Sequence, residues 1–160
     1  MTIRILAVCL GNICRSPTAE AVLRAEAARA RLDLKVDSAG TSDWHIGNPP
    51  YPPAITAAAA RGYDLAPLRA RQVAAADFHA FDLILAMDTK NRETLDALRG
   101  GEGAPVHLFL DYAEGVVGCS VPDPYYTRDF DRALDLIEAA ARGLVAQLSQ
   151  NASAVSPKAR

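Results

Sequence analysis

A short segment near the start of the chain carries the residues best suited to chemistry. It reads VCLGNICRSP from Val8 to Pro17 and follows an apolar run. Glycine and asparagine accept backbone conformations that other residues avoid, and proline favours the first turn of a helix. The segment is therefore predicted to be a loop between a strand and a helix, with its backbone arranged around a bound group.

The chemistry of this loop suits an anion. Successive backbone N–H groups from Leu10 to Ser16 can curl around one centre, and the positive end of the following helix adds to them. Arg15 supplies a planar fork that matches two phosphate oxygens. A cradle of this kind also stabilises the thiolate of Cys9, which is the nucleophilic form of cysteine. Phosphoryl transfer is therefore expected, with the fixed donors contributing more than thiolate activation alone.

Two other interpretations of the same residues explain fewer features of the sequence. Cys9 could be a small core residue and Arg15 a surface charge, but the preceding strand, the internal glycine and the Ser-Pro pair all fit the anion cradle. Cys9 and Cys14 could bind zinc, but no second pair of cysteines or histidines lies at zinc-finger spacing. The sequence therefore favours an anion site with no metal.

Length and composition place the chain among ordinary single-domain proteins. Its 160 residues carry a formal net charge of −2, so no global basic field would attract nucleic acid. Three cysteines, an odd number, favour a reducing compartment over a disulfide-linked scaffold. No segment has the features of a signal peptide or the length of a membrane span. We expect a cytoplasmic protein that neither inserts into membranes nor binds nucleic acid.

The elements that must position the loop alternate between strands and helices. Strands are expected at 3–9, 34–38, 81–87 and 106–110, and helices at 18–32, 54–61, 89–98 and 128–148. This alternation predicts a mostly parallel sheet covered on both faces. Ligands of such sheets bind beyond the carboxyl ends of the strands, where the loop lies. Residues 1–150 would form one domain, and residues 151–160 a disordered tail.

Matches in five separate segments make the sequence resemble the low-molecular-weight protein tyrosine phosphatases. These segments are CLGNICRS (9–16), DSAGTSDWHIGNPP (37–50), ARQV (70–73), AMDTKN (86–91) and DPYY (123–126). The resemblance extends from Ile3 to about Leu148. It implies an α/β fold of three layers, in which helices flank a four-stranded parallel sheet of order 2-1-3-4. It also implies a phosphocysteine intermediate and no metal or other cofactor.

The resemblance assigns catalytic roles to three residues. Cys9 would be the nucleophile, Arg15 the phosphate clamp and Asp123 the general acid that protonates the departing tyrosyl oxygen. The same carboxylate would then take a proton from the water that attacks phosphocysteine. Without the resemblance, Asp123 would read as a turn aspartate before Pro124.

Further residues would bind the substrate or support the loop, again as the resemblance implies. The phosphoryl group would be surrounded by Leu10, Gly11, Asn12, Ile13, Cys14 and Ser16, and the aromatic ring would be flanked by Trp44, Tyr125 and Tyr126. Ser38 and Asp88 would support the loop, and Asp88 is also placed to cap the helix that follows it. Cys14 would be either a redox partner of Cys9 or inert packing.

One position departs from the family pattern. Leu68 stands where family members often have a histidine that supports the loop asparagine, so the loop either has another support or is less rigid.

Two other functions compete with phosphatase activity. The first is that of a thiol-dependent arsenate reductase of the same architecture. Such an enzyme usually needs two further cysteines, and here only Cys119 lies outside the loop, with no partner that the sequence identifies. A noncatalytic phosphoprotein-binding module would need neither Cys9 nor Asp123. We expect phosphotyrosine-containing proteins as substrates, with a tyrosine kinase as one candidate.

Overall fold

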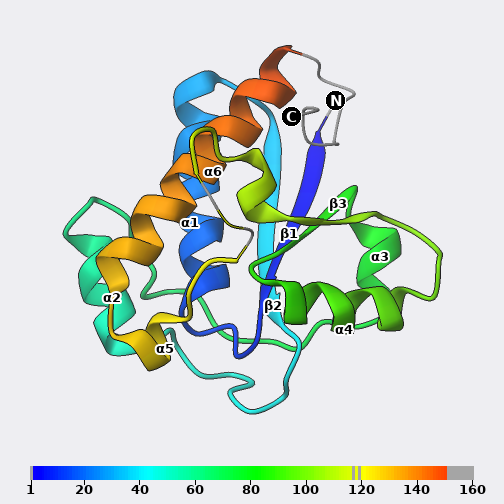
Figure 1. Ribbon diagram of the computed structural model, residues 1–160, viewed down its shortest axis with the longest axis horizontal. Coiled ribbons are helices and arrows are strands. Elements are labelled where there is room, and N and C mark those ends of the chain that lie inside the picture. Colours follow the sequence, from blue (N-terminus) through cyan, green and yellow to red (C-terminus); the bar gives the residue numbers. More distant parts are fainter. Residues whose placement is uncertain (1, 117, 119, 151–160) are drawn as a thin grey trace.

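The computed structural model describes residues 2–116, 118 and 120–150. Within them the centre of the molecule is a parallel sheet of four strands with the order β2-β1-β3-β4 (Figure 1). The strands are β1 (Ile3–Cys9), β2 (Leu34–Gly40), β3 (Leu83–Ala86) and β4 (Val106–Leu108). The expected fold class, strand number and strand order are confirmed.

Helices cover both faces of this sheet, as Figure 1 shows. They are α1 (Arg15–Ala30), α2 (Pro52–Ala59), α3 (Asp77–Ala80), α4 (Thr89–Arg99), α5 (Pro124–Thr127) and α6 (Phe130–Gln150), with a 3-10 helix, η1, at Phe109–Tyr112. Helices α1 and α6 pack against one another on one side, and α3 and α4 lie on the other. None of the helices in the described ranges is long and apolar enough to cross a bilayer.

The alternation of side chains along β1 builds a separate apolar core on each face. Ile5 and Ala7 pack with residues of α1 and α6, whereas Leu6 and Val8 pack with Phe78 of α3 and with α4. All four β1 side chains are fully buried. A parallel strand covered on both faces reads as a continuous apolar run, which explains the start of the sequence.

Several boundaries differ from the predicted ones, and the differences matter near the loop. Helix α1 begins at Arg15 rather than Thr18, so Arg15 and Ser16 belong to its first turn. Strand β2 continues beyond Ser38 to Gly40, which pairs with Cys9. Helices α3 and α5 were not predicted, because a helix of four residues is too short to show helical periodicity.

Candidate active site

The loop between β1 and α1 has the unusual backbone that its composition indicates. Asn12 has a φ of 56°, in the left-handed region that asparagine tolerates better than most residues. In this conformation the Asn12 N–H donates to the Cys9 sulfur over 3.3 Å. Gly40 lies against the same loop, where a Cβ atom would come within 2.8 Å of the Leu10 carbonyl oxygen. The end of β2 therefore needs glycine for the loop to approach it.

Side-chain hydrogen bonds fix the conformation of the loop between β1 and α1. The Cys9 sulfur lies 3.0 Å from the Ser16 hydroxyl, and the Asn12 amide nitrogen donates to Ser16 over 2.7 Å and to Ser38 over 3.0 Å. The Asn12 carbonyl oxygen accepts from the Arg71 backbone N–H over 3.0 Å. Leu68 instead packs with an apolar cluster beside the loop. The loop thus has another support in place of the absent histidine, and it comes from the main chain of the ARQV segment.

Arg15 is buried, with 3% of its surface exposed, and most of its guanidinium is fixed. Its Nη1 donates to Asp88 over 2.6 Å and to the Val121 carbonyl oxygen over 3.1 Å, and its Nη2 donates to Asp123 over 3.2 Å. Its Nε has no hydrogen-bond partner among the described residues, although it is buried. A buried donor without a partner is costly, so this nitrogen is available to an anionic ligand.

Negatively charged groups surround the Arg15 guanidinium and stabilise its positive charge. Burial acts to lower the pKa of Arg15, but the Cys9 sulfur and the carboxylates of Asp123 and Asp88 outweigh it and raise that pKa above its ordinary value. The guanidinium is therefore a permanent cation beside the nucleophile candidate. This is the arrangement that an incoming phosphate needs.

A pocket of about 320 Å³ opens above the loop. Its floor is formed by Cys9, Leu10, Gly11, Ile13 and Cys14, and its walls by Trp44, His45, Asp123, Tyr125 and Tyr126. This volume lies at the lower end of the range for small-molecule sites. The structure thus brings together loop residues and the aromatic residues predicted from the sequence, whereas Asn12, Arg15 and Ser16 are buried and do not line the pocket.

His45 lines the pocket, although its role there was not predicted from the sequence. A Cβ atom added to Gly11 would lie 3.0 Å from the His45 ring, so the ring rests against the loop itself. The signal available in the sequence was its position next to Trp44 in the matching segment.

The mouth of the pocket is lined by aromatic rings that remain largely exposed. Trp44 is 65% exposed and Tyr126 is 68% exposed. The Tyr125 ring lies 5.1 Å from that of Tyr51 and 5.3 Å from that of Tyr126, measured between ring centres. Exposed apolar rings around a concave site are typical of a binding surface.

Asp123 caps a helix and also lines the pocket, so the two interpretations of this residue are compatible. Its Oδ1 accepts from the Tyr125 backbone N–H over 3.1 Å, which makes it the N-cap of α5. Its Oδ2 faces Arg15, and its side chain lines the pocket. A turn residue before proline is therefore also placed where it can exchange a proton with a ligand.

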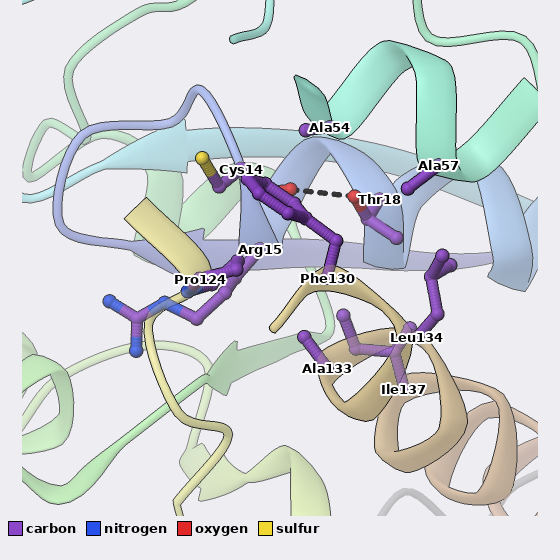
Figure 2. Close-up of a pocket in the computed structure, with 10 residues that line it drawn as sticks. All are labelled: Cys14, Arg15, Thr18, Ala54, Ala57, Pro124, Phe130, Ala133, Leu134 and Ile137. Atoms are coloured by element: carbon purple, nitrogen blue, oxygen red, sulfur yellow. Dashed lines mark hydrogen bonds between the residues drawn. The ribbon is translucent and has the colours of Figure 1, made fainter. Parts of the chain in front are cut away.

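Cys14 is buried on the pocket floor, and both it and Cys9 are free thiols. Burial, followed by the proximity of Cys9 and Asp123, raises the pKa of Cys14 to about 12. Behind Cys14, between α1, α2 and α6, lies a small, mainly apolar cavity with room for about one water molecule (Figure 2). Figure 2 also shows the Arg15 guanidinium turned away from Leu134 and Ile137 of α6. Cys119 lies outside the described residues.

The described part of the chain contains no cluster of three or more histidine, cysteine or acidic residues arranged to hold a metal ion.

Comparison with known proteins gives consistent matches over almost the whole chain. Residues 4–154 match the family described as low molecular weight phosphotyrosine protein phosphatase. The chain is 41% identical to the low molecular weight protein-tyrosine-phosphatase YfkJ of Bacillus subtilis over 151 residues, which cover 92% of this chain and 97% of that protein. It is 44% identical to the low molecular weight phosphotyrosine protein phosphatase of Schizosaccharomyces pombe over 128 residues, or 78% of this chain and 81% of that one. The crystal structure of YfkJ superposes with a TM-score of 0.89 at 40% identity, covering 94% of this chain and 96% of YfkJ.

Proposed function

The chain belongs to the low molecular weight phosphotyrosine protein phosphatase family, and we propose that it hydrolyses phosphotyrosine in proteins through a phosphocysteine intermediate on Cys9. The observation that carries the mechanism is the buried Arg15 side chain. Its Nη1 and Nη2 are held by Asp88 and Asp123, while its Nε has no partner among the described residues. A phosphoryl oxygen supplies the missing acceptor.

In the proposed first step, the phosphoryl oxygens accept hydrogen bonds from the loop N–H groups and from Arg15. The Cys9 sulfur attacks phosphorus, a sulfur–phosphorus bond forms and the bond from phosphorus to the tyrosyl oxygen breaks. Asp123 gives its proton to the departing oxygen, which leaves as a neutral phenol.

In the proposed second step, water attacks the phosphorus of phosphocysteine. Asp123, now ionised, takes a proton from that water, the sulfur–phosphorus bond breaks and the sulfur leaves with the bonding electrons. Inorganic phosphate and the Cys9 thiolate are the products, and the enzyme returns to its starting state.

The ion pair between Arg15 and Asp123 supports an order of events in which the substrate first binds Arg15 and Asp123 then acts as the acid. Nη2 of Arg15 donates to Asp123 over 3.2 Å, so a dianionic phosphoryl group competes with the carboxylate for the same cation. Binding of the substrate weakens the hold of Arg15 on Asp123. The carboxyl group can then carry the proton that the leaving oxygen needs.

The pocket walls support an aryl phosphate rather than an alkyl phosphate. Trp44, Tyr126 and Ile13 line the pocket, and we propose that the two aromatic side chains flank a flat ring while Ile13 adds an apolar contact. A phosphoserine side chain is shorter than phosphotyrosine and has no ring for these aromatic walls to contact. The substrates we propose are therefore proteins that carry exposed phosphotyrosine.

The decisive experiment compares hydrolysis of p-nitrophenyl phosphate and of matched phosphotyrosine, phosphoserine and phosphoarginine peptides. Wild type should prefer phosphotyrosine and should yield a phosphorylated cysteine when the reaction is quenched in acid. Cys9→Ser should be inactive. Asp123→Asn should slow the phosphotyrosine peptide more than p-nitrophenyl phosphate, because nitrophenolate leaves without a proton. Turnover that survives Cys9→Ser contradicts the proposal, and binding without turnover indicates a phosphoprotein-binding module.

A further inference from the structure

A second depression lies close to the pocket, between α2 and the start of α6. It is an open groove of about 610 Å³, and the two helices that border it are in contact (Figure 1). Its apolar surface comes mainly from Pro52, Pro53 and Ala57 of α2 and from Phe130 of α6. The mechanism proposed above gives this groove no part.

Tyr51 joins the groove to the pocket. Its ring centre lies 5.1 Å from that of Tyr125, which lines the pocket, and 6.3 Å from that of Phe130, which lines the groove. Its backbone N–H donates to the Ile13 carbonyl oxygen over 2.8 Å, so its position is fixed relative to the loop between β1 and α1. A polypeptide with one side chain in the pocket can therefore continue across these rings into the groove.

Arg128 places a positive charge at this junction. Its side chain lines the groove, its Nη1 donates to the Tyr51 hydroxyl over 2.6 Å, and its guanidinium carbon lies 5.6 Å from the centre of the Tyr51 ring. Among the described residues the guanidinium has no other hydrogen-bond partner and no carboxylate partner. Arginine carries five N–H hydrogens, so those on Nε and Nη2 are available to a carboxylate.

The acidic residues of the groove, in contrast, already have partners. The Asp129 carboxylate accepts from the Arg132 backbone N–H over 2.9 Å, and Asp131 forms an ion pair with Arg61 at 3.3 Å. Arg61 also pairs with two further carboxylates of α6, so negative charge is in excess there. The groove is therefore positive beside Tyr51 and negative at Asp131.

The charge on Arg128 is close enough to the pocket to act on its floor. Burial raises the pKa of Cys14, and Arg128 is one of two cations that act to lower it. The separations from Tyr125 to Tyr51 and from Tyr51 to the guanidinium are 5.1 and 5.6 Å. An extended chain advances about 3.3 Å per residue, so a side chain two or three positions from a residue in the pocket can reach Arg128.

We propose that Arg128 is a specificity-determining residue, which binds an acidic side chain two or three positions from the phosphotyrosine of a protein substrate. The carboxylate accepts hydrogen bonds from the guanidinium, and the adjoining part of the substrate packs on Pro52 and Pro53. A longer acidic run is disfavoured, because it would meet the negative charge at Asp131. The inference rests on the proposed function, since it assumes that phosphotyrosine occupies the pocket.

The test uses phosphotyrosine peptides that differ at one position. Glutamate, glutamine or lysine is placed two or three residues before or after phosphotyrosine, and kcat/KM is measured for each peptide. At one of these positions wild type should prefer glutamate to glutamine by about 3- to 10-fold, as expected for a charge-assisted contact at the surface, and lysine should be poorest. The preference should shrink in about 0.5 M sodium chloride, which screens exposed charges.

Variants of Arg128 are compared by the ratio of kcat/KM for the glutamate peptide to that for the glutamine peptide. This ratio cancels any effect of a substitution on the nucleophile. Arg128→Met should bring the ratio to about one, and Arg128→Lys, which keeps the charge without the planar fork, should retain part of the preference. Arg132→Met should keep the wild-type ratio, because Arg132 is an exposed arginine of α6 that does not line the groove.

A further variant protects the test against a folding defect. Arg128 has a φ of 64°, which glycine adopts without strain. Arg128→Gly therefore removes the side chain and suits the backbone, and it should also bring the ratio to about one.

The outcomes separate this inference from the proposed function. A wild-type protein that hydrolyses none of the phosphotyrosine peptides, or activity that survives Cys9→Ser, contradicts the proposed function. Cys9-dependent turnover of all the peptides at equal kcat/KM overturns the role of Arg128 alone. A glutamate preference that Arg128→Met or Arg128→Gly retains also overturns it, as does one that Arg132→Met loses equally, which indicates an effect of net charge.

Discussion

At the scale of single residues, Arg15 combines several fixed contacts with one nitrogen that stays open to a ligand. Its two terminal nitrogens reach Asp88, Val121 and Asp123, and its Nε is left without a partner among the described residues. A lysine in its place has one nitrogen and cannot keep these contacts while facing a phosphoryl group.

Arg15→Lys should therefore lower kcat/KM for p-nitrophenyl phosphate by about 100- to 1,000-fold, the loss expected for one preorganised donor. Weaker competitive inhibition by inorganic phosphate should accompany the loss. Arg142→Lys, an exposed substitution on α6, is the matched control and should behave as wild type. A variant at position 15 that keeps more than half of the wild-type activity would contradict the proposed clamp.

Cys14 gives a second prediction at this scale. Its raised pKa, about 12, keeps it a neutral thiol at physiological pH, so peroxide should oxidise Cys9 first, to a sulfenic acid. Condensation with Cys14 would then release water and form a disulfide, which dithiothreitol reduces. Without Cys14, excess peroxide would oxidise the sulfenic acid further to a sulfinic acid, which dithiothreitol does not reduce. We expect peroxide-inactivated wild type to regain activity with dithiothreitol and Cys14→Ser to remain inactive. Equal recovery of the two proteins would leave Cys14 as inert packing.

The residues that the sequence could and could not identify differ in a physical way. Cys9 and Arg15 are recognisable because one loop holds them at a fixed spacing between a strand and a helix. His45 and Arg71 act on that loop from other segments, and Arg71 does so through a backbone N–H that any residue except proline could supply. Only the folded structure shows such contacts.

At the scale of elements, Asp88 links the start of α4 to the loop between β1 and α1. Its Oδ1 accepts from the Asn91 N–H as the N-cap of α4, and its Oδ2 accepts from Arg15 over 2.6 Å. The capping was predicted from the sequence, because an aspartate before a polar segment is a typical helix start. The contact with Arg15 joins segments 73 residues apart and required the structure.

The two functions of Asp88 can be separated by substitution. Both Asp88→Asn and Asp88→Ala remove the negative partner of the buried Arg15, so both should lower kcat and destabilise the protein. Asn is a good N-cap and Ala is not, so Asp88→Ala should be less stable than Asp88→Asn by about 1 kcal/mol through loss of the cap. Urea unfolding and steady-state kinetics on both variants test this. Equal stability of the two variants would contradict the capping role.

Helix α6 makes a close contact at Gly143. A Cβ atom there would overlap the Tyr112 carbonyl oxygen at the end of η1. Replacing glycine by alanine within a helix ordinarily stabilises it by about 0.5 to 1 kcal/mol. Here Gly143→Ala should instead cost about 1 to 3 kcal/mol, the usual effect of overpacking. Ala146→Gly, at an exposed position of α6, should cost only the helix-propensity difference of about 1 kcal/mol. Stabilisation by Gly143→Ala in urea unfolding would contradict the contact.

At the scale of the whole molecule, the sheet brings distant parts of the sequence to one edge. The site combines the loop after β1 with Ser38 and Gly40 of β2, Arg71 of the following segment, and Asp123. The alternation of strands and helices predicted this convergence, because the carboxyl ends of parallel strands meet at one edge. Loop conformations and the short helices α3 and α5 could not be predicted in this way, since they depend on contacts between segments.

This construction predicts that ligand binding stabilises the whole protein. A ligand that binds only the folded state adds RT ln(1 + [L]/Kd), or about 2.7 kcal/mol at 100 times Kd. Inorganic phosphate should therefore raise the urea midpoint of wild type above its value in sodium chloride of equal ionic strength. Arg15→Lys should lose most of this gain in stability, because lysine lacks the planar guanidinium that binds two phosphate oxygens. Arg142→Lys should keep the gain. If phosphate stabilised the Arg15 variant as much as wild type, phosphate would be binding elsewhere on the molecule, and the cradle would not be its site.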